Sequence, residues 1–433
     1  MSVPPASAYA DVARRGLAVL RSMRGAAGHL AQLADFADPR WAPAAEREKL
    51  EAELAHLRAG AREPLDAKRV ERLLRGAWGG KLSDHLEDLG DEPVALAAAG
   101  QVHRATLEDG RAVAVKLVHP GAEDALRADL VNVALLAQLG AAIVPGLDAR
   151  AIAGELRERA LEELDLEHEA QAMRTFARAY RGHPFVFVPA PVTELCHTGV
   201  LVAEWVDGTA FEDVLELDQE ARDRYGEILV RFHTGAMLHT GAFHADPHPG
   251  NHRLLDDGRV AFLDYGATGR ADAAWLAGLL DAADALEQDD ADRFKRDLAG
   301  LGYLAAPERL DGGALLAHAR ASAGPLLSDD PVRIDQDLAL AAMEAQAEHA
   351  GTIEDLLRHG RVPARDLQAG RMMAGLGAVL ARLEARAPWG AIAAEPRRGG
   401  APATPLGEQD AAFWAGRGHS RADAVQGLRR AAA

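Results

Sequence analysis

The sequence predicts an α+β fold with two lobes: a small lobe that contains β-strands, a larger and mostly helical lobe, and an extra helical segment ahead of both. Two observations predict this order. Residues 100–118 alternate apolar and polar side chains around the turn Glu108-Asp109-Gly110, which is typical of a β-hairpin. From Phe211 onward, apolar residues recur mostly at helical spacing. A chain of 433 residues also suits two lobes better than one small core.

The remaining elements follow from the same periodicities. Helical spacing covers residues 7–90, 121–139 and 151–180, and short apolar runs at 185–188 and 200–204 predict strands. A long helix is expected from about Phe211 to His239, then a loop, a strand pair around Asp256-Asp257-Gly258, and helices to about Ala394. The chain divides into a helical extension that packs on the core (1–90), a small lobe with inserted helices (91–210), a helical lobe (211–395), and a linker with a flexible tail (396–433), because Gly399, Gly400, Pro402 and Pro405 interrupt regular structure there.

Composition argues against several classes of function. The net charge of -18 disfavours nucleic acid as a partner, because phosphate contacts need a basic surface. The single cysteine, Cys196, cannot form an internal disulfide, and the chain does not open with a signal-peptide pattern, so a cytoplasmic protein is expected. The uncharged run 130–147 contains polar residues and Pro145, and it predicts a buried helix and turn rather than a membrane span.

The loop His244-Ala-Asp-Pro-His-Pro-Gly-Asn251, followed by Asp264, carries the strongest chemical signal. Phosphoryl transfer needs a carboxylate beside the attacking oxygen and ligands for a metal ion that bridges the phosphates. Asp246 and Asn251 have the spacing of the catalytic loop of kinases, and Asp264 ends an apolar strand before Tyr265-Gly266 as the metal-binding aspartate of such enzymes does. The pattern predicts Asp246 as the catalytic carboxylate and Asn251 and Asp264 as Mg²⁺ ligands.

Two other interpretations of this loop remain open. His244, His248 and His252 are four residues apart and would share a metal-binding face on a helix, but the prolines and the glycine between them rule out a regular helix. The loop could also be a plain surface turn in which Asp246 and Asn251 satisfy backbone donors.

Lys116, Glu169 and an alanine-rich segment add to the signal. Lys116 lies in a strand where Val113, Val115 and Leu117 face one side and Lys116 the other, with small alanine neighbours that leave room for a nucleotide. Glu169, in an acidic helix, is the candidate partner of its ammonium group. No glycine-rich loop precedes Lys116; residues 95–101, Ala-Leu-Ala-Ala-Ala-Gly-Gln, take that place.

With these motifs in this order, the sequence resembles the UbiB/AarF family of atypical kinases, whose eukaryotic members support coenzyme Q biosynthesis. The resemblance implies a bilobal protein-kinase-like fold and ATP with Mg²⁺ as cofactors. It implies that Lys116 contacts the phosphates and pairs with Glu169, and that the backbone of Glu204-Trp205-Val206 meets the adenine. The residues it places at the nucleotide are Ala97, Ala98, Ala99, Gly100, Gln101, Lys116, Glu204 and Val206.

The resemblance also implies a regulatory contact, and here the sequence departs from the family. Glu163 and Asp165 resemble the family's E-x-D motif. The N-terminal K-x-G-Q signature falls at residues 29–32, where Gln32 is kept but His29 stands in place of lysine. His29, with a reference pKa near 6.5, should hold Glu163 less firmly than lysine would at neutral pH.

These observations favour an ATPase, or a kinase that acts on a small or lipid-like molecule, with a link to quinone metabolism from the resemblance alone. A nucleotide-gated scaffold with little turnover and an aminoglycoside- or choline-type phosphotransferase are the alternatives. Any membrane contact would be peripheral, for example through the apolar residues 372–376. The phosphate acceptor and the oligomeric state stay open.

Overall fold

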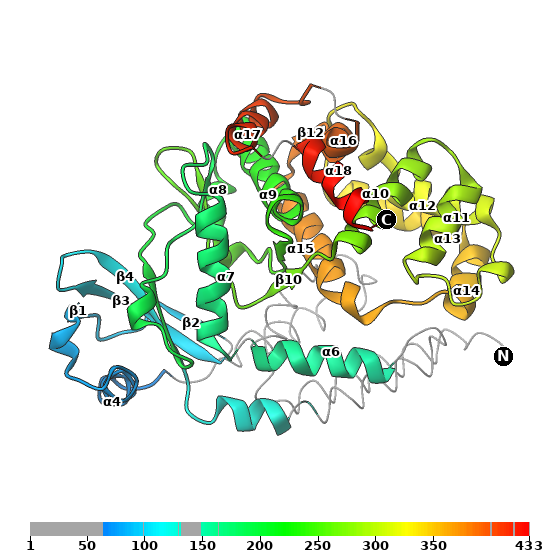
Figure 1. The fold of residues 1–433 in the computed structure, drawn as a ribbon. Helices are drawn as coiled ribbons and strands as arrows, with labels where there is room; N and C mark the ends of the chain where they lie inside the picture. Colours follow the sequence, from blue (N-terminus) through cyan, green and yellow to red (C-terminus); the bar gives the residue numbers. More distant parts are fainter. Residues whose placement is uncertain are drawn as a thin grey trace, which may run out of the picture.

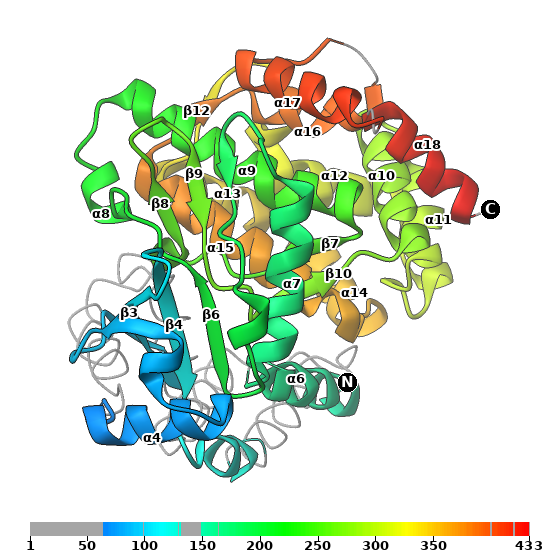
Figure 2. The same cartoon turned by 60° about the vertical axis from the view of Figure 1, so that its left-hand side comes forward.

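The structure, a computed structural model, describes residues 64–97, 99–128, 130, 149–162, 164–398, 401–418 and 421–432. A small lobe built on a five-stranded antiparallel sheet lies beside a larger helical lobe (Figures 1 and 2). This is the bilobal, kinase-like α+β arrangement that the sequence predicts. The helices expected at residues 7–63 and 131–148 lie outside the described residues.

The sheet of the small lobe has the strand order β1-β3-β4-β6, with β2 paired to β3. Its strands are β1 (Leu86–Leu89), β2 (Ala95–Ala97), β3 (Gly100–Leu107), β4 (Ala112–Val118) and β6 (Val200–Glu204). The predicted hairpin around residues 108–110 is β3–β4, with Val102 opposite Lys116. The boundary expected at residue 90 is wrong, because β1 already belongs to this sheet; with four residues, this edge strand is too short to show a period.

Helices cover both faces of the sheet. On one face, Val70 and Leu74 of α4 (Ala67–Trp78) pack against Val113, Val115 and Leu117 of β4. The opposite face, which carries Lys116, meets α7 (Leu166–Ala179), and α6 (Ala149–Glu162) precedes α7. The alternation in β4 therefore places an apolar row under α4 and directs Lys116 toward the second lobe.

The helical lobe is organised around α9 (Gln219–Thr240), which runs through its core. Phe232 of α9 stacks on Phe262 at 3.6 Å between ring centroids. The other helices are α8 (Phe211–Val214), α10 (Ala273–Glu287), α11 (Ala291–Gly300), α12 (Gly312–Ala323), α13 (Gln336–Ala347), α14 (Ala350–His359), α15 (Leu367–Leu383), α16 (Trp389–Arg398), α17 (Pro405–Gly416) and α18 (Arg421–Ala432). Short strands join them: β5 (Val186–Phe187), β7 (Ala242–His244), β8 (His252–Leu254), β9 (Val260–Phe262), β10 (Thr268–Arg270), β11 (Val332–Arg333) and β12 (Arg386–Ala387).

The single long helix expected from Phe211 to His239 is two helices. The break falls before α9, where the Asp218 carboxylate accepts a hydrogen bond from the backbone N–H of Ala221. Aspartate favours this capping position, and a new helix therefore begins there.

The prediction of a flexible tail over residues 396–433 is also wrong. Pro405 is the first residue of α17, and the Thr404 side chain caps the helix by accepting from Gly407 N–H. Proline is well tolerated in the first turn of a helix, so the residue that indicated a linker begins a helix instead. Trp414 of α17 is buried in the core and stacks on His239 of α9 at 3.8 Å.

A buried arginine ties this C-terminal part to α9. Arg231 donates to both carboxylate oxygens of Glu395 at 2.9 Å, to Glu227 at 2.6 Å and to the Thr404 hydroxyl at 2.9 Å. Its side chain is 1% exposed. The Arg231 cluster, defined as these four residues, joins α9, α16 and the cap of α17.

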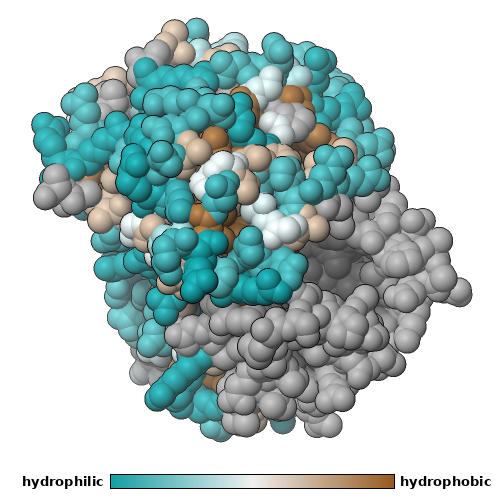
Figure 3. Space-filling model, turned by 90° about the vertical axis from the view of Figure 1, so that its right-hand side faces the viewer, coloured by the Kyte–Doolittle hydropathy of each residue, from teal (hydrophilic) through white to brown (hydrophobic). Residues whose placement is uncertain are grey.

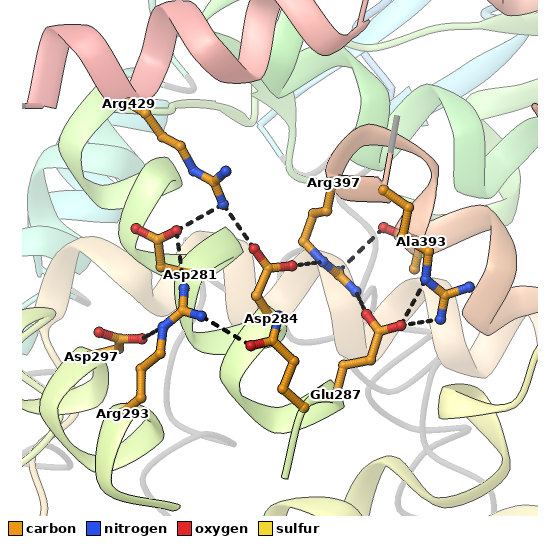
Figure 4. Close-up of polar contacts among 10 residues, drawn as sticks. Asp281, Asp284, Glu287, Arg293, Asp297, Ala393, Arg397 and Arg429 are labelled. Atoms are coloured by element: carbon orange, nitrogen blue, oxygen red, sulfur yellow. Dashed lines mark hydrogen bonds and ion pairs between the residues drawn. The ribbon is translucent and has the colours of Figure 1, made fainter. Parts of the chain in front are cut away.

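A second, more exposed set of ion pairs holds α16 and α18 against α10 (Figure 4). Arg397 of α16 contacts Asp284 and Glu287, each at 2.8 Å. Arg429 of α18 contacts Asp281 and Asp284, also at 2.8 Å. Three acidic residues on one face of α10 therefore meet arginines from two helices near the end of the chain.

The surface in Figure 3 is mostly hydrophilic where residues are described, with hydrophobic residues in small separate patches. Met372 and Leu376 of the apolar stretch considered for membrane contact are buried in the core, and Met373 is exposed. In the described part of the chain, no helix is both long enough and apolar enough to cross a membrane.

Candidate functional site

Lys116 joins the two lobes. Its Nζ lies 3.0 and 2.9 Å from the two carboxylate oxygens of Glu169 and 3.1 Å from Oδ1 of Asp264. Strand β4 supplies the lysine, helix α7 the glutamate, and the segment after β9 the aspartate. The pairing of Lys116 with Glu169 expected from the sequence is present, and Asp264 meets the same ammonium group.

The two carboxylates differ in their electrostatics. Burial raises the pKa of Glu169 to about 7, although the nearby Lys116 ammonium opposes this shift. Burial acts on Asp264 in the same direction, but Lys116 and the Gly266 N–H outweigh it and hold the pKa of Asp264 below its usual value. The two carboxylates in turn raise the pKa of Lys116 against the effect of its burial. When this site takes up one proton, Glu169 is the group that binds it.

This difference predicts a pH-dependent stability. Because the pKa of Glu169 in the folded chain, about 7, lies above the ordinary 4.5, its contribution is fully present below pH 4.5 and is lost as the pH rises through about 7. Relative to Glu169→Gln, the wild-type chain should lose stability over this window, on the order of 3 kcal/mol. Urea unfolding of both chains between pH 4.5 and 8 measures the difference, with Glu108→Gln in the exposed turn as the matched control. Parallel curves would mean that Glu169 is ionised throughout.

Asp264 is held in an unusual backbone conformation. Its φ of 56° lies in the left-handed region, which aspartate tolerates better than most residues. Its side chain accepts from Gly266 N–H at 3.2 Å. His244 Nε2–H donates to the backbone carbonyls of Leu263 and Asp264 at 3.0 and 2.7 Å. Burial lowers the pKa of His244, so the ring stays neutral and serves as a fixed donor behind Asp264.

The predicted catalytic loop brings Asp246 and Asn251 together. Asn251 Nδ2 donates to Oδ2 of Asp246 at 3.2 Å and to its backbone carbonyl at 3.4 Å. Because Nδ2 makes both of these contacts, the amide oxygen of Asn251 is the atom that could bind a cation. Arg371 of α15 forms an ion pair with Oδ1 of Asp246 at 3.4 Å. The sequence carries no signal for Arg371, because this residue lies far along the chain in a helix without a motif.

The structure does not favour a zinc site. Among the described residues, no group of three His, Cys, Asp or Glu side chains could hold a metal ion. His244 is committed to backbone carbonyls, and His252 packs against Phe262 with its ring buried. The structure also argues against the interpretation of this loop as a plain surface turn, because Asp246 and Asn251 are both buried.

The alanine-rich segment is a tight hairpin between β2 and β3, with Ala97 paired to Gly100. Ala98 lies outside the described residues, and the carbonyl of Ala99 accepts from His119 N–H at 2.8 Å. Gln101, which the sequence predicts at the nucleotide, has its side chain fully buried on the face of the sheet opposite Lys116. Its strand neighbour Val102 shares the Lys116 face.

Val102 was not among the predicted site residues, although its position in the kinase pattern could have indicated it. In the kinase pattern G-x-G-x-x-G-x-V, Gly100 stands at the last glycine and Val102 at the valine, with alanines at the first two glycine positions. Val102 is therefore a further candidate for nucleotide contact.

Gly100 is the one position in this hairpin where only glycine fits. A Cβ at Gly100 would lie 2.0 Å from the carbonyl oxygen of Leu117. We expect Gly100→Ala to push β3 away from β4 and to destabilise the chain by about 1–3 kcal/mol, as other overpacking changes do. Thermal unfolding measures this, and Gly154→Ala is the control, because that exposed helical glycine has no atom within 4 Å of a built Cβ. Equal stability of the two variants would contradict the prediction.

Of the other predicted site residues, some lie at the ends of β6 and α7 and some lie outside the described residues. Glu204 ends β6, and its carboxylate accepts from Ala190 N–H at 2.9 Å, while Val206 follows the strand, half-buried. Asp165 caps α7 by accepting from the backbone N–H groups of Glu167 and His168. His29, Gln32 and Glu163, predicted as regulatory, lie outside the described residues.

Fold and site together define a class: a two-lobed kinase-like protein in which a strand lysine meets a helix glutamate and an aspartate of the second lobe. Residues 59–298, more than half of the chain, match the model of the ABC1 atypical kinase-like domain. The chain therefore belongs to this family, and the UbiB/AarF membership that the sequence predicts is confirmed.

Individual relatives agree with this family. "Protein ACTIVITY OF BC1 COMPLEX KINASE 1, chloroplastic" of Arabidopsis thaliana is 33% identical over 233 residues, which are 52% of this chain and 34% of the relative. "Atypical kinase coq-8, mitochondrial" of Caenorhabditis elegans is 30% identical over 261 residues, 59% of this chain and 34% of the relative. The chain thus spans about a third of the length of these relatives. A solved structure of Rv3197 with erythromycin, from Mycobacterium tuberculosis, is 30% identical with a TM-score of 0.62 and covers 77% of this chain and 83% of that chain.

Proposed function

We propose that this chain is an ATP-dependent enzyme of the atypical-kinase type. It binds Mg·ATP between the lobes and either hydrolyses it or transfers the terminal phosphoryl group to a small or lipid-like acceptor. The observation that carries this proposal is the position of Lys116, within 3.1 Å of both Glu169 and Asp264. Kinase catalysis requires the lysine–glutamate pair and the metal-binding aspartate to be in place together.

In this proposal each residue of the site has one task. Lys116 contacts the α- and β-phosphates, and Asp246 orients the attacking oxygen. Asn251 and Asp264 hold Mg²⁺. Their amide and carboxylate oxygens fit this ion, which prefers oxygen ligands and takes the rest of its shell from phosphate and water. The backbone of residues 97–101 covers the phosphates, and the backbone from Glu204 to Val206 meets the adenine.

One observation favours a second candidate, a nucleotide-gated binding protein with little turnover. Arg371 forms an ion pair with Asp246, the carboxylate that would orient the attacking oxygen. The guanidinium of Arg371 occupies one oxygen of this carboxylate and competes with an acceptor hydroxyl for it. Under this candidate, ATP binding changes the affinity for a lipid or a protein, and hydrolysis is slow whatever the acceptor.

An ATPase assay on the wild-type chain separates the two candidates. Phosphate release is measured with Mg·ATP alone, with anionic lipid vesicles, with a quinone-like aromatic compound and with erythromycin, and Asp264→Asn serves as the blank. Stimulated release, or a phosphorylated acceptor seen by mass spectrometry, supports the enzyme. Nucleotide-dependent vesicle binding without stimulated release supports the binding protein. A chain that Mg·ATP does not stabilise in thermal unfolding would refute both.

A further inference from the structure

A buried polar cluster lies on the face of the small-lobe sheet opposite Lys116. Its members are Gln101, His103 and His119, which are 0%, 1% and 5% exposed. Burying three polar side chains costs free energy unless each finds hydrogen-bond partners. Their partners therefore show what this cluster holds in place.

The contacts of Gln101 reach the start of the described chain. Its Oε1 accepts from the backbone N–H of Leu65 at 2.7 Å and from His119 Nε2 at 2.9 Å. Its Nε2 lies 2.7 Å from His103 Nε2 and 3.5 Å from the Leu65 carbonyl. Leu65 lies next to Asp66, the N-cap of helix α4, and is the second described residue of the chain.

Two backbone groups fix the direction of every hydrogen bond in the cluster. The Leu65 N–H can only donate, so the oxygen of the Gln101 amide faces it, and His119 must donate through a protonated Nε2. The Gly90 carbonyl can only accept, so His103 Nδ1, 2.8 Å away, carries the proton of that ring. His103 Nε2 is then the lone pair that accepts from Gln101 Nε2–H. The chain of hydrogen bonds is consistent from one end to the other.

The same cluster reaches the nucleotide hairpin. The backbone N–H of His119 donates to the carbonyl of Ala99 at 2.8 Å, in the turn between β2 and β3. The imidazole of His119 donates to Gln101. One residue thus links the turn proposed to cover the phosphates to the amide that holds Leu65.

We propose that Gln101 is a positioning residue that sets the nucleotide hairpin through His119 and couples it to Leu65. This inference rests on the proposed nucleotide site. When Leu65 and His119 occupy both acceptor positions of the amide, the hairpin is held in its closed position against the end of β4. When the Leu65 contact is lost, His119 and the turn at Ala99 are held less firmly, and the nucleotide binds less tightly. An apolar side chain of equal size would fill the same space without this link.

The test compares Gln101→Met, which removes all four contacts, with Gln101→Glu, whose carboxylate keeps the acceptor for Leu65 N–H and His119 but loses the donor to His103 and to the Leu65 carbonyl. We expect the Kd for Mg·ATP to rise roughly tenfold in Gln101→Met, as when the competent arrangement is populated about a tenth of the time. Gln101→Glu should lie between this variant and the wild type. Val70→Ala, a buried change under the same sheet, is the control: it lowers the unfolding temperature and leaves the Kd unchanged.

Hydrogen exchange separates coupling from a merely structural role, because a structural role alone would not make deuterium uptake near Leu65 depend on Mg·ATP. In the full wild-type chain, Mg·ATP should slow deuterium uptake of the peptide around Leu65, because coupling between two sites is reciprocal. In Gln101→Met this peptide should exchange faster and should not respond to Mg·ATP. A wild-type chain that binds Mg·ATP without any change at Leu65, or a Gln101→Met variant with unchanged Kd, overturns the inference. A wild-type chain that does not bind Mg·ATP overturns the proposed function instead. In that case the exchange rates at Leu65 without nucleotide, compared between the wild type and Gln101→Met, still test whether Gln101 holds Leu65.

Discussion

Asp264→Asn should abolish the Mg²⁺-dependent stabilisation of the chain by ATP and reduce ATP turnover by roughly 100-fold or more, since even changes behind a metal ligand cost up to that much. The change removes the negative charge of the proposed Mg²⁺ ligand and keeps the shape of the side chain. The fold should survive, because Lys116 keeps its partner Glu169 at 2.9 Å and His244 contacts the backbone of Asp264, which the change does not alter. Thermal unfolding with ATP, with and without Mg²⁺, measures the first effect, and phosphate release measures the second.

Asp256→Asn is the matched control for this prediction. Asp256 is exposed in the turn between β8 and β9, in the same hairpin that delivers Asp264. This variant should behave as the wild type in both assays. If ATP with Mg²⁺ shifts the unfolding temperature of Asp264→Asn as much as that of the wild type, Asp264 does not bind Mg²⁺ and its assigned role is wrong.

Arg231→Met should cost about 3–5 kcal/mol of folding stability, the range found when one partner of a buried ion pair is removed. The change takes the Arg231 guanidinium away from two buried carboxylates, Glu395, which is 6% exposed, and Glu227, which is 10% exposed. It also removes a donor to Thr404, which caps α17. We therefore expect α17 to loosen before the rest of the lobe, with faster proteolysis between α16 and α17. Urea unfolding followed by tryptophan fluorescence reports this, because Trp414 lies in α17.

Arg333→Met provides the comparison. Arg333 pairs with Glu384 at 3.2 Å, and both side chains are about half exposed, so this change should cost less than about 1 kcal/mol. Adding Glu395→Gln to Arg231→Met should recover part of the loss, because it removes one of the stranded charges. Similar losses for Arg231→Met and Arg333→Met would show that the Arg231 cluster does not stabilise the fold.

The features that sequence reasoning predicted correctly depend on short-range patterns. The β3–β4 hairpin follows from a turn flanked by alternating side chains, and the Lys116–Glu169 pair follows from motif order. The juxtaposition of Asp246 with Asn251 follows from five residues of spacing within one loop. The signals for the hairpin and for the loop lie within a few residues of the features that they predict, whereas Lys116 and Glu169 are 53 positions apart and their pairing follows from the order of the motifs. Local chemistry and the final packing agree there.

The features that the sequence did not reveal depend on contacts between distant segments. Pro405 indicates a linker by itself, and it begins a helix because Trp414 finds a buried place against α9. Arg371 reaches Asp246 from α15, which no local pattern connects to the loop. Gln101 follows the alanine-rich turn directly, and its side chain nevertheless lies on the face opposite Lys116, since side chains alternate between the two faces of a strand.

The burial of Leu406 and Trp414 in the main core has a consequence for how the protein must be handled and made. The family match ends at residue 298, yet the core that contains Phe262 and Tyr265 is completed by side chains more than a hundred positions later. A fragment cut at the end of the match would expose the apolar surfaces of α9 that α17 covers, and it should aggregate rather than fold. During synthesis, too, the helical lobe can finish folding only after α17 has left the ribosome.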